Sequence, residues 1–147
     1  QTNPFLKKYL LQNTIWWIEY AGIDGIREDT YPYCNQYAMS DWVKEILIEY
    51  PMLNIVGEIW TGEPAFLAAY QRENKFGIKP DSHLPCVTDF GLSDALRDYL
   101  SGKKNLDGVF NTLAKDYLYH DANNLLTFID NHDIARGLFT AYNDVDT

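Results

Sequence analysis

The sequence predicts an α/β fold with a parallel sheet, built as part of a barrel of alternating strands and helices. Short apolar runs that end in polar residues alternate with stretches in which apolar residues recur every three or four positions. Strands that are separated by helices favour a parallel sheet with right-handed crossovers. The chain has 147 residues, whereas a complete barrel of this kind needs roughly 250. We therefore expect residues 1–147 to be about half of a single barrel domain.

The helices are predicted from their apolar spacing and from residues that begin or end a helix. Pro4 suits a first helical turn after Asn3 as the N-cap, and Gly22 is expected to end this first helix. Residues 37–50 have the clearest helical pattern, which Pro51 stops. Further helices are predicted over residues 64–71, 93–100, 106–117 and 134–142.

Strand-like runs lie between these helices and end in polar or aromatic residues. They are predicted over residues 23–29, 53–60, 86–90 and 125–130, with residues 74–82 as a loop. The carboxyl ends of parallel barrel strands converge on one face, which is where such folds hold their functional residues. Side chains that directly follow the predicted strands are therefore the candidates for a functional site.

Composition excludes several classes of function. The formal net charge is -9 and no run is rich in Lys or Arg, which argues against nucleic acid, because clustered positive charge supplies affinity for phosphates. Cys34 and Cys86 have no metal-like spacing and are expected to be free thiols. No apolar stretch approaches the roughly 20 residues of a membrane span. Gln1 and Thr147 suggest cuts through a longer parent chain, so the sequence gives no localisation.

Three acidic residues, each in its own short motif, follow predicted strands. They are Asp29 in Gly-Ile-Arg-Glu-Asp, Glu58 in Val-Gly-Glu-Ile-Trp and Asp133 in Phe-Ile-Asp-Asn-His-Asp. Cleavage of a glycosidic bond with retention needs a carboxylate nucleophile and a carboxylic acid about 5 to 5.5 Å away. Neighbouring strands lie about 4.8 Å apart, so Asp29 and Glu58 can reach this separation. The acids therefore predict hydrolysis of sugar bonds.

Residues beside the acids fit this chemistry. Arg27 is two positions before Asp29, so strand alternation points both side chains the same way and lets the guanidinium hold the nucleophile ionised. Ile59 and Trp60 are expected to give Glu58 the apolar cover that keeps a proton on an acid.

The three motifs, in this order and spacing, resemble three motif regions of the α-amylase family of retaining glycoside hydrolases. In that family the regions follow the fourth, fifth and seventh barrel strands. The resemblance spans essentially the whole chain and implies a partial (β/α)8 TIM barrel that covers roughly strands four to seven. Residues 16–22 and 25–33 are most similar to the cyclomaltodextrinase/neopullulanase branch.

The resemblance implies a role for each candidate residue. It implies Asp29 as nucleophile, Glu58 as general acid/base, Asp133 as transition-state stabiliser, and Arg27 and His132 as substrate-orienting residues. Tyr31, Tyr33 and Trp60 are candidates for stacking on sugar rings, with plain packing as an equally open reading for each. The implied substrates are α-1,4-linked maltooligosaccharides, cyclodextrins and related starch-derived glucans. No cofactor or metal ligand is identified, and calcium binding and homo-oligomerisation of the parent stay open.

The sequence departs from the family pattern at several places. Pro32 and Tyr33 replace a Lys-His pair that many α-amylases carry, and Glu28 stands where the family usually has an apolar residue. Alternation aims Glu28 toward the helical layer, where an unpaired charge is unfavourable. The family motif after the third strand and the eighth strand have no counterpart. We therefore expect no significant activity from this chain alone, and a non-catalytic barrel used for binding or assembly remains the alternative.

Overall fold

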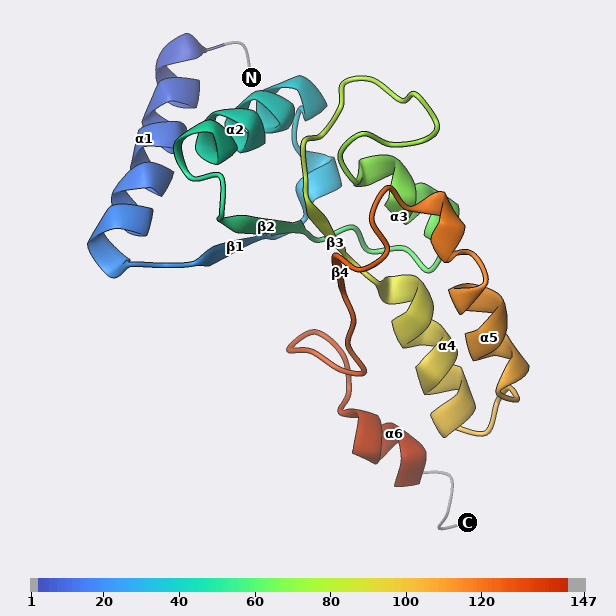
Figure 1. Ribbon diagram of the computed structural model, residues 1–147. Coiled ribbons are helices and arrows are strands. Elements are labelled where there is room, and N and C mark those ends of the chain that lie inside the picture. The colour runs from blue at the N-terminus through green and yellow to red at the C-terminus, as the bar shows by residue number, and fades with distance from the viewer. Residues whose placement is uncertain (1–2, 143–147) are drawn as a thin grey trace.

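The computed structural model describes residues 3–142 as an α/β structure with a four-stranded sheet (Figure 1). Its elements are α1 (Pro4–Ala21), β1 (Gly25–Glu28), the 3-10 turn η1 (Tyr31–Tyr33), α2 (Gln36–Glu49), β2 (Asn54–Gly57), α3 (Pro64–Tyr70), β3 (Cys86–Thr88), α4 (Phe90–Leu100), α5 (Asp107–Leu113), the 3-10 turn η2 (Asp116–Leu118), β4 (Leu125–Leu126) and α6 (Gly137–Tyr142). Strands and helices alternate through most of the chain, as predicted.

The sheet has the order β1-β2-β3-β4 and every pair of neighbours is parallel. Chain order and spatial order therefore coincide, which is the arrangement of consecutive strands in a barrel wall. Helices α1 and α2 lie together beside β1 and β2, while α4 and α5 lie side by side beyond β3 (Figure 1). All four strands consequently point their carboxyl ends toward the same edge of the sheet.

The caps of the helices follow from the residues predicted to form them. The Asn3 side chain accepts hydrogen bonds from the backbone N–H groups of Phe5 and Leu6, and Gly22 ends α1 in the left-handed conformation at φ 62°. Glycine adopts this conformation at little energetic cost because it has no Cβ. Pro51 follows α2, which ends at Glu49, so the predicted stop is also confirmed.

Several boundaries differ from the predicted ones, in most cases because polar side chains form hydrogen bonds with nearby backbone groups. The predicted strand over residues 86–90 ends at Thr88, since Asp89 caps α4 by accepting a hydrogen bond from the N–H of Leu92. The predicted helix over residues 106–117 is divided into α5 and η2. The predicted strand over residues 125–130 is only β4, because Asp130 and Asn131 accept hydrogen bonds within the loop that follows.

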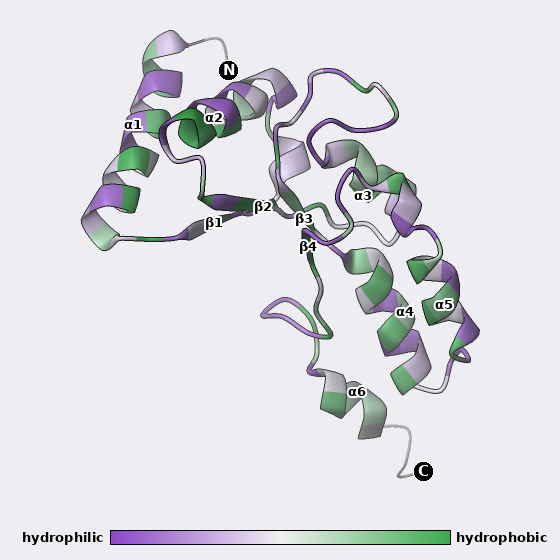
Figure 2. Cartoon of the chain, viewed as in Figure 1, coloured by the Kyte–Doolittle hydropathy of each residue, from purple (hydrophilic) through white to green (hydrophobic). Residues whose placement is uncertain are grey.

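The core lies between the strands and the helices α2 and α3. Figure 2 shows hydrophobic residues along β2 and on the neighbouring helix α2. The largest fully buried aliphatic side chains are Ile46, Ile55, Ile59, Leu67 and Leu84. Cys34 and Cys86 are free thiols, as predicted. Among the described residues, no helix combines the length and the apolar character that a membrane crossing requires.

Candidate active site

The carboxyl ends of β1 and β2 form the candidate site. Glu28 lies opposite Gly57 in the parallel register, so the residues that follow each strand are neighbours. Backbone hydrogen bonds continue past the strands: the N–H of Glu58 donates to the Glu28 carbonyl at 2.9 Å, and the N–H of Tyr31 donates to the Glu58 carbonyl at 3.2 Å. Two consecutive motifs are thereby fixed against each other.

Arg27 lies between two of the predicted acids. Its Nη2 is 2.6 Å from Glu58 Oε1 and 3.5 Å from Asp29 Oδ1. The predicted pairing of Arg27 with Asp29 is present, but the shorter ion pair is the one with Glu58. The Glu58 side chain is only 4% exposed, whereas that of Asp29 is 65% exposed. The guanidinium therefore joins a buried carboxylate to an accessible one.

Thr30 supplies a second contact to Glu58 that the sequence analysis missed. Its backbone N–H donates to Glu58 Oε2 at 3.0 Å. Thr30 has φ 49°, a left-handed conformation that is unfavourable for a β-branched residue and that marks strained turns at functional sites. Both oxygens of Glu58 thus accept hydrogen bonds.

Trp60 belongs to a row of aromatic rings along the same rim. The residue is 55% exposed, and its ring stacks on that of buried Phe90, with centroids 5.0 Å apart and an interplanar angle of 21°. Phe90 contacts Phe128 edge-on at 5.0 Å. Phe90 and Phe128 were not predicted as site residues, although both closely follow a strand. Ile59 is buried in the core, so Trp60 presents the accessible apolar surface next to Glu58.

Tyr31 does not form the stacking surface that was considered for it. Its side chain is fully buried, its hydroxyl lies 3.4 Å from the Ser82 carbonyl, and its ring packs edge-on against Tyr70. Burial, followed by the charge of Glu28, raises the pKa of Tyr31 well above its usual range. Its backbone N–H, at the start of η1, donates to the Glu58 carbonyl. Tyr31 is a core residue.

His132 and Asp133 lie on the loop after β4. His132 Nε2 is 3.2 Å from Asp133 Oδ2, with the two side chains 67% and 38% exposed. Within residues 3–142, no hydrogen bond or ion pair joins either residue to Arg27, Asp29 or Glu58. The structure therefore brings two of the three predicted acids into one cluster and leaves the third on a separate loop.

Glu28 faces the helical layer, as strand alternation predicts. It lines a cleft of about 710 Å³ between α1 and α2, whose lining includes none of Arg27, Asp29 and Glu58. Burial, with the neighbouring charge of Asp29, raises the pKa of Glu28. Within the described part of the chain, its carboxylate has no hydrogen bond or ion pair. Among the described residues, Glu28 is therefore the partly buried, unpaired acidic residue that the sequence analysis expected at this position.

No protein-family model matches the chain, but curated proteins do. It is 30% identical to the cyclomaltodextrin glucanotransferase of Bacillus sp. (strain 6.6.3) over 97% of its length, which is 19% of that protein. It is 27% identical to the cyclomaltodextrinase of Thermoanaerobacter pseudethanolicus over 95% of its length, or 23% of that protein. The chain thus spans less than a quarter of these relatives.

Solved structures give the same relationship. The α-amylase of Geobacillus thermoleovorans, solved with acarbose, superposes with a TM-score of 0.84 at 26% identity over 100% of this chain and 32% of that one. The Anoxybacillus α-amylase superposes with a TM-score of 0.83 at 26% identity, over 99% of this chain and 30% of that one. The predicted partial barrel is therefore confirmed.

Proposed function

Because the homologues and structural neighbours of this chain are α-amylase family members, as the motifs predicted, we propose that its parent protein is a retaining α-glucan hydrolase. Residues 1–147 form part of its single catalytic barrel domain. The observation that carries the proposal is the position of Arg27 between Asp29 and Glu58, at the ends of neighbouring parallel strands. The substrates are α-1,4-glucosidic bonds of maltooligosaccharides, cyclodextrins or related starch-derived glucans.

The two acids of the cluster differ in accessibility in a way that suits their roles. Asp29 is exposed and attacks the anomeric carbon, forming a covalent glycosyl-enzyme intermediate as the glycosidic bond breaks. Glu58 gives its proton to the leaving oxygen, and then takes a proton from the water or sugar hydroxyl that releases the intermediate. Arg27 keeps Asp29 oriented throughout and partners Glu58 in its ionised form.

The remaining candidates act on the sugar around the reacting bond. His132 and Asp133 donate and accept hydrogen bonds at neighbouring hydroxyl groups, and the charge of Asp133 stabilises the oxocarbenium-like transition state. The exposed face of Trp60 offers a surface for an adjacent sugar ring. Tyr31 has no part in binding, since its ring is buried in the core.

The proposal is tested with two substitutions in the full-length parent protein. Glu58→Gln keeps the hydrogen-bond acceptor at Oε1 but carries no transferable proton, so hydrolysis of soluble starch and β-cyclodextrin should fall by about 10²- to 10⁴-fold. Asp29→Asn should abolish turnover, because the amide is not a nucleophile. Glu49→Gln, at the exposed end of α2, is the matched control and should retain full activity. Undiminished hydrolysis by Glu58→Gln would exclude Glu58 as acid/base.

The substrate preference distinguishes branches of the family. A cyclomaltodextrinase and cyclomaltodextrin glucanotransferases are among the relatives, so both water and a sugar hydroxyl are candidate acceptors. The sequence motifs favour the cyclomaltodextrinase/neopullulanase branch, for which β-cyclodextrin should be cleaved faster than soluble starch. Faster release of reducing sugar from starch would instead favour an ordinary α-amylase.

A non-catalytic barrel is the second candidate, and one observation favours it. Both oxygens of Glu58 are engaged, by Arg27 and by the N–H of Thr30, which is the arrangement of a structural carboxylate that joins two strand ends. In that case the parent protein would release no sugar from starch, pullulan or β-cyclodextrin. Glu58→Gln would then lower the stability of the protein and change no reaction rate.

A further inference from the structure

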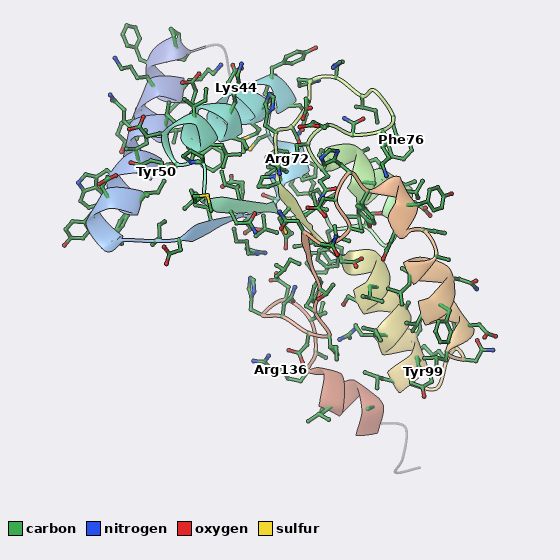
Figure 3. The ribbon with its side chains drawn as sticks, in the orientation of Figure 1. Lys44, Tyr50, Arg72, Phe76, Tyr99 and Arg136 are labelled. Atoms are coloured by element: carbon green, nitrogen blue, oxygen red, sulfur yellow. The ribbon has the colours of Figure 1, made fainter. Side chains whose placement is uncertain are left out.

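The loop that carries His132 and Asp133 lies outside the sheet. Strand β4 ends at Leu126 and α6 begins at Gly137, so residues 127–136 are not held by strand pairing. Figure 3 shows Arg136 at the end of this loop, beside the start of α6. A catalytic acid on such a loop needs other contacts to fix its position, because a misplacement of about 1 Å can lower a rate about 100-fold.

Contacts within the loop fix its shape but not its place. Asn131 Oδ1 accepts hydrogen bonds from the N–H groups of Asp133 and Ile134, at 2.9 and 3.1 Å. The Asp130 carboxylate accepts hydrogen bonds from Arg136 Nη1 and from the N–H of Gly137, at 2.7 and 2.8 Å. Each of these bonds joins residues that are close in sequence. None of them connects the loop to the barrel wall.

Arg97 supplies such a connection from α4. Its Nη1 donates to the Ala135 carbonyl at 2.8 Å and reaches the Ile129 carbonyl at 3.5 Å. These two carbonyls flank residues 130–134, so a single nitrogen joins both sides of the loop. Helix α4 is itself fixed to the sheet, because its N-cap Asp89 directly follows β3 and donates its N–H to the Leu126 carbonyl of β4.

We propose that Arg97 is a positioning residue that holds the His132–Asp133 loop against α4 and thereby sets the place of Asp133 at the carboxyl-end site. This inference rests on the proposed function for the role of Asp133, but not for the contact itself. Arg97 touches no substrate and acts through the loop backbone. Removal of the Arg97 side chain should therefore lower kcat more than it raises KM, because a misplaced Asp133 stabilises the transition state less well.

A double-mutant cycle in the full-length parent protein tests the coupling. Arg97→Met should lower kcat by about 10- to 100-fold when Asp133 is intact. In the Asp133→Asn background, Arg97→Met should lower kcat by less than about 3-fold, because both substitutions remove the same contribution of Asp133 to the rate. Lys104→Met, which removes a cation just after α4 that pairs with Asp98, is the matched control and should leave kcat unchanged. Equal losses in the two backgrounds would overturn the proposal.

Hydrogen exchange tests the contact without reference to activity. In Arg97→Met, the amides of residues 127–137 should exchange faster, while those of β2 and β3 keep their wild-type rates. Unchanged exchange in the loop would refute the contact even if kcat fell. Should the parent hydrolyse no α-glucan, the proposed function fails and the exchange result alone decides whether Arg97 holds the loop. If Arg97→Met does not fold, Arg97→Lys, whose shorter side chain keeps the charge, replaces it in both experiments with a smaller expected loss.

Discussion

Gly57 lies directly before Glu58, and its backbone leaves no space for a side chain. A Cβ at this position would lie 2.5 Å from Leu84 Cδ1 and 3.4 Å from the Tyr31 ring. We expect Gly57→Ala to lower the free energy of unfolding by about 1 to 3 kcal/mol, since overpacking a buried site forces neighbours out of place. Urea unfolding of the parent protein measures it. Gly108→Ala in α5, where the nearest atom is 3.9 Å away, is the control and should be neutral or stabilising.

Glu28 gives a prediction about pH. Its pKa is raised in the folded protein, chiefly by burial, so the folded state binds a proton more readily than the unfolded state does. The ionised carboxylate therefore destabilises the fold at neutral pH, and this penalty fades as the pH falls through the raised pKa. It is gone once the pH is below the usual pKa of an unfolded glutamate.

Glu28→Gln should consequently stabilise the parent protein at pH 7, on the order of 0.5 kcal/mol. The gain should shrink toward zero as the pH is lowered past the usual range of glutamate. Urea unfolding at a series of pH values measures this difference. Glu45→Gln, which lines the same cleft from an exposed position on α2, provides the comparison and should show a smaller gain at pH 7. A gain for Glu28→Gln that stayed constant with pH would contradict the explanation by burial.

At the scale of elements, Gln71 joins three segments that strand pairing leaves separate. It follows α3 and is fully buried. Its Nε2 donates to the carbonyls of Pro85, Asp121 and Asn124, and its Oε1 accepts from the N–H of Asp121 at 2.9 Å. The end of α3 is thereby tied to the segments that lead into β3 and β4.

Gln71→Met fills the same space but leaves these buried backbone groups without a partner. We expect it to lower the free energy of unfolding by about 2 to 4 kcal/mol, as thermal or urea unfolding of the parent protein would measure. Asn54→Ala removes an exposed hydrogen bond of 3.3 Å to Asn124 and a hydrogen bond with the Cys86 thiol at the same end of the sheet, and should change stability by less than about 1 kcal/mol. Similar losses of stability for both variants would show that Gln71 does not hold α3 to the segments that lead into β3 and β4.

The order of elements could be predicted from sequence, whereas several of their ends could not. The alternation of helices and strands could be predicted from the apolar periodicity and from end signals such as Pro51 and Gly22, because these are local properties of the sequence. The length of β4 depends on whether Asp130 and Asn131 satisfy backbone groups locally or leave them to a neighbouring strand. That competition is decided by tertiary contacts, which a single sequence does not display.

The candidate site shows the same division at the scale of the whole molecule. Motif order and spacing were enough to predict that Asp29 and Glu58 follow neighbouring strands and that Arg27 pairs with Asp29. The shorter ion pair of Arg27 with Glu58 was not predicted. The burial of Tyr31 could not be predicted, since a tyrosine after a strand can turn toward solvent or toward the core with equal ease. Arg97 could not be found either, because it is 38 residues from Ala135 and lies on a helix without a functional motif.

Large apolar side chains remain exposed at both ends of the described chain. On α1 they include Phe5, Trp16, Trp17 and Tyr20, and on α6 they include Leu138 and Phe139. Strands β1 and β4 are the two edges of the sheet, and each offers unpaired backbone groups to another strand. Exposed apolar surface next to open strand edges favours association with other chains.

We therefore expect residues 1–147, when purified alone, to self-associate and to hydrolyse no starch or β-cyclodextrin. Besides its uncovered surfaces, this chain contributes only part of the barrel wall. Within residues 3–142, no hydrogen bond or ion pair joins His132 or Asp133 to the Arg27–Glu58 pair. Sedimentation velocity should show species larger than the monomer, with reducing-sugar release at the level of an Asp29→Asn control. A monodisperse monomer with robust turnover would mean that half a barrel suffices both to fold and to assemble the site.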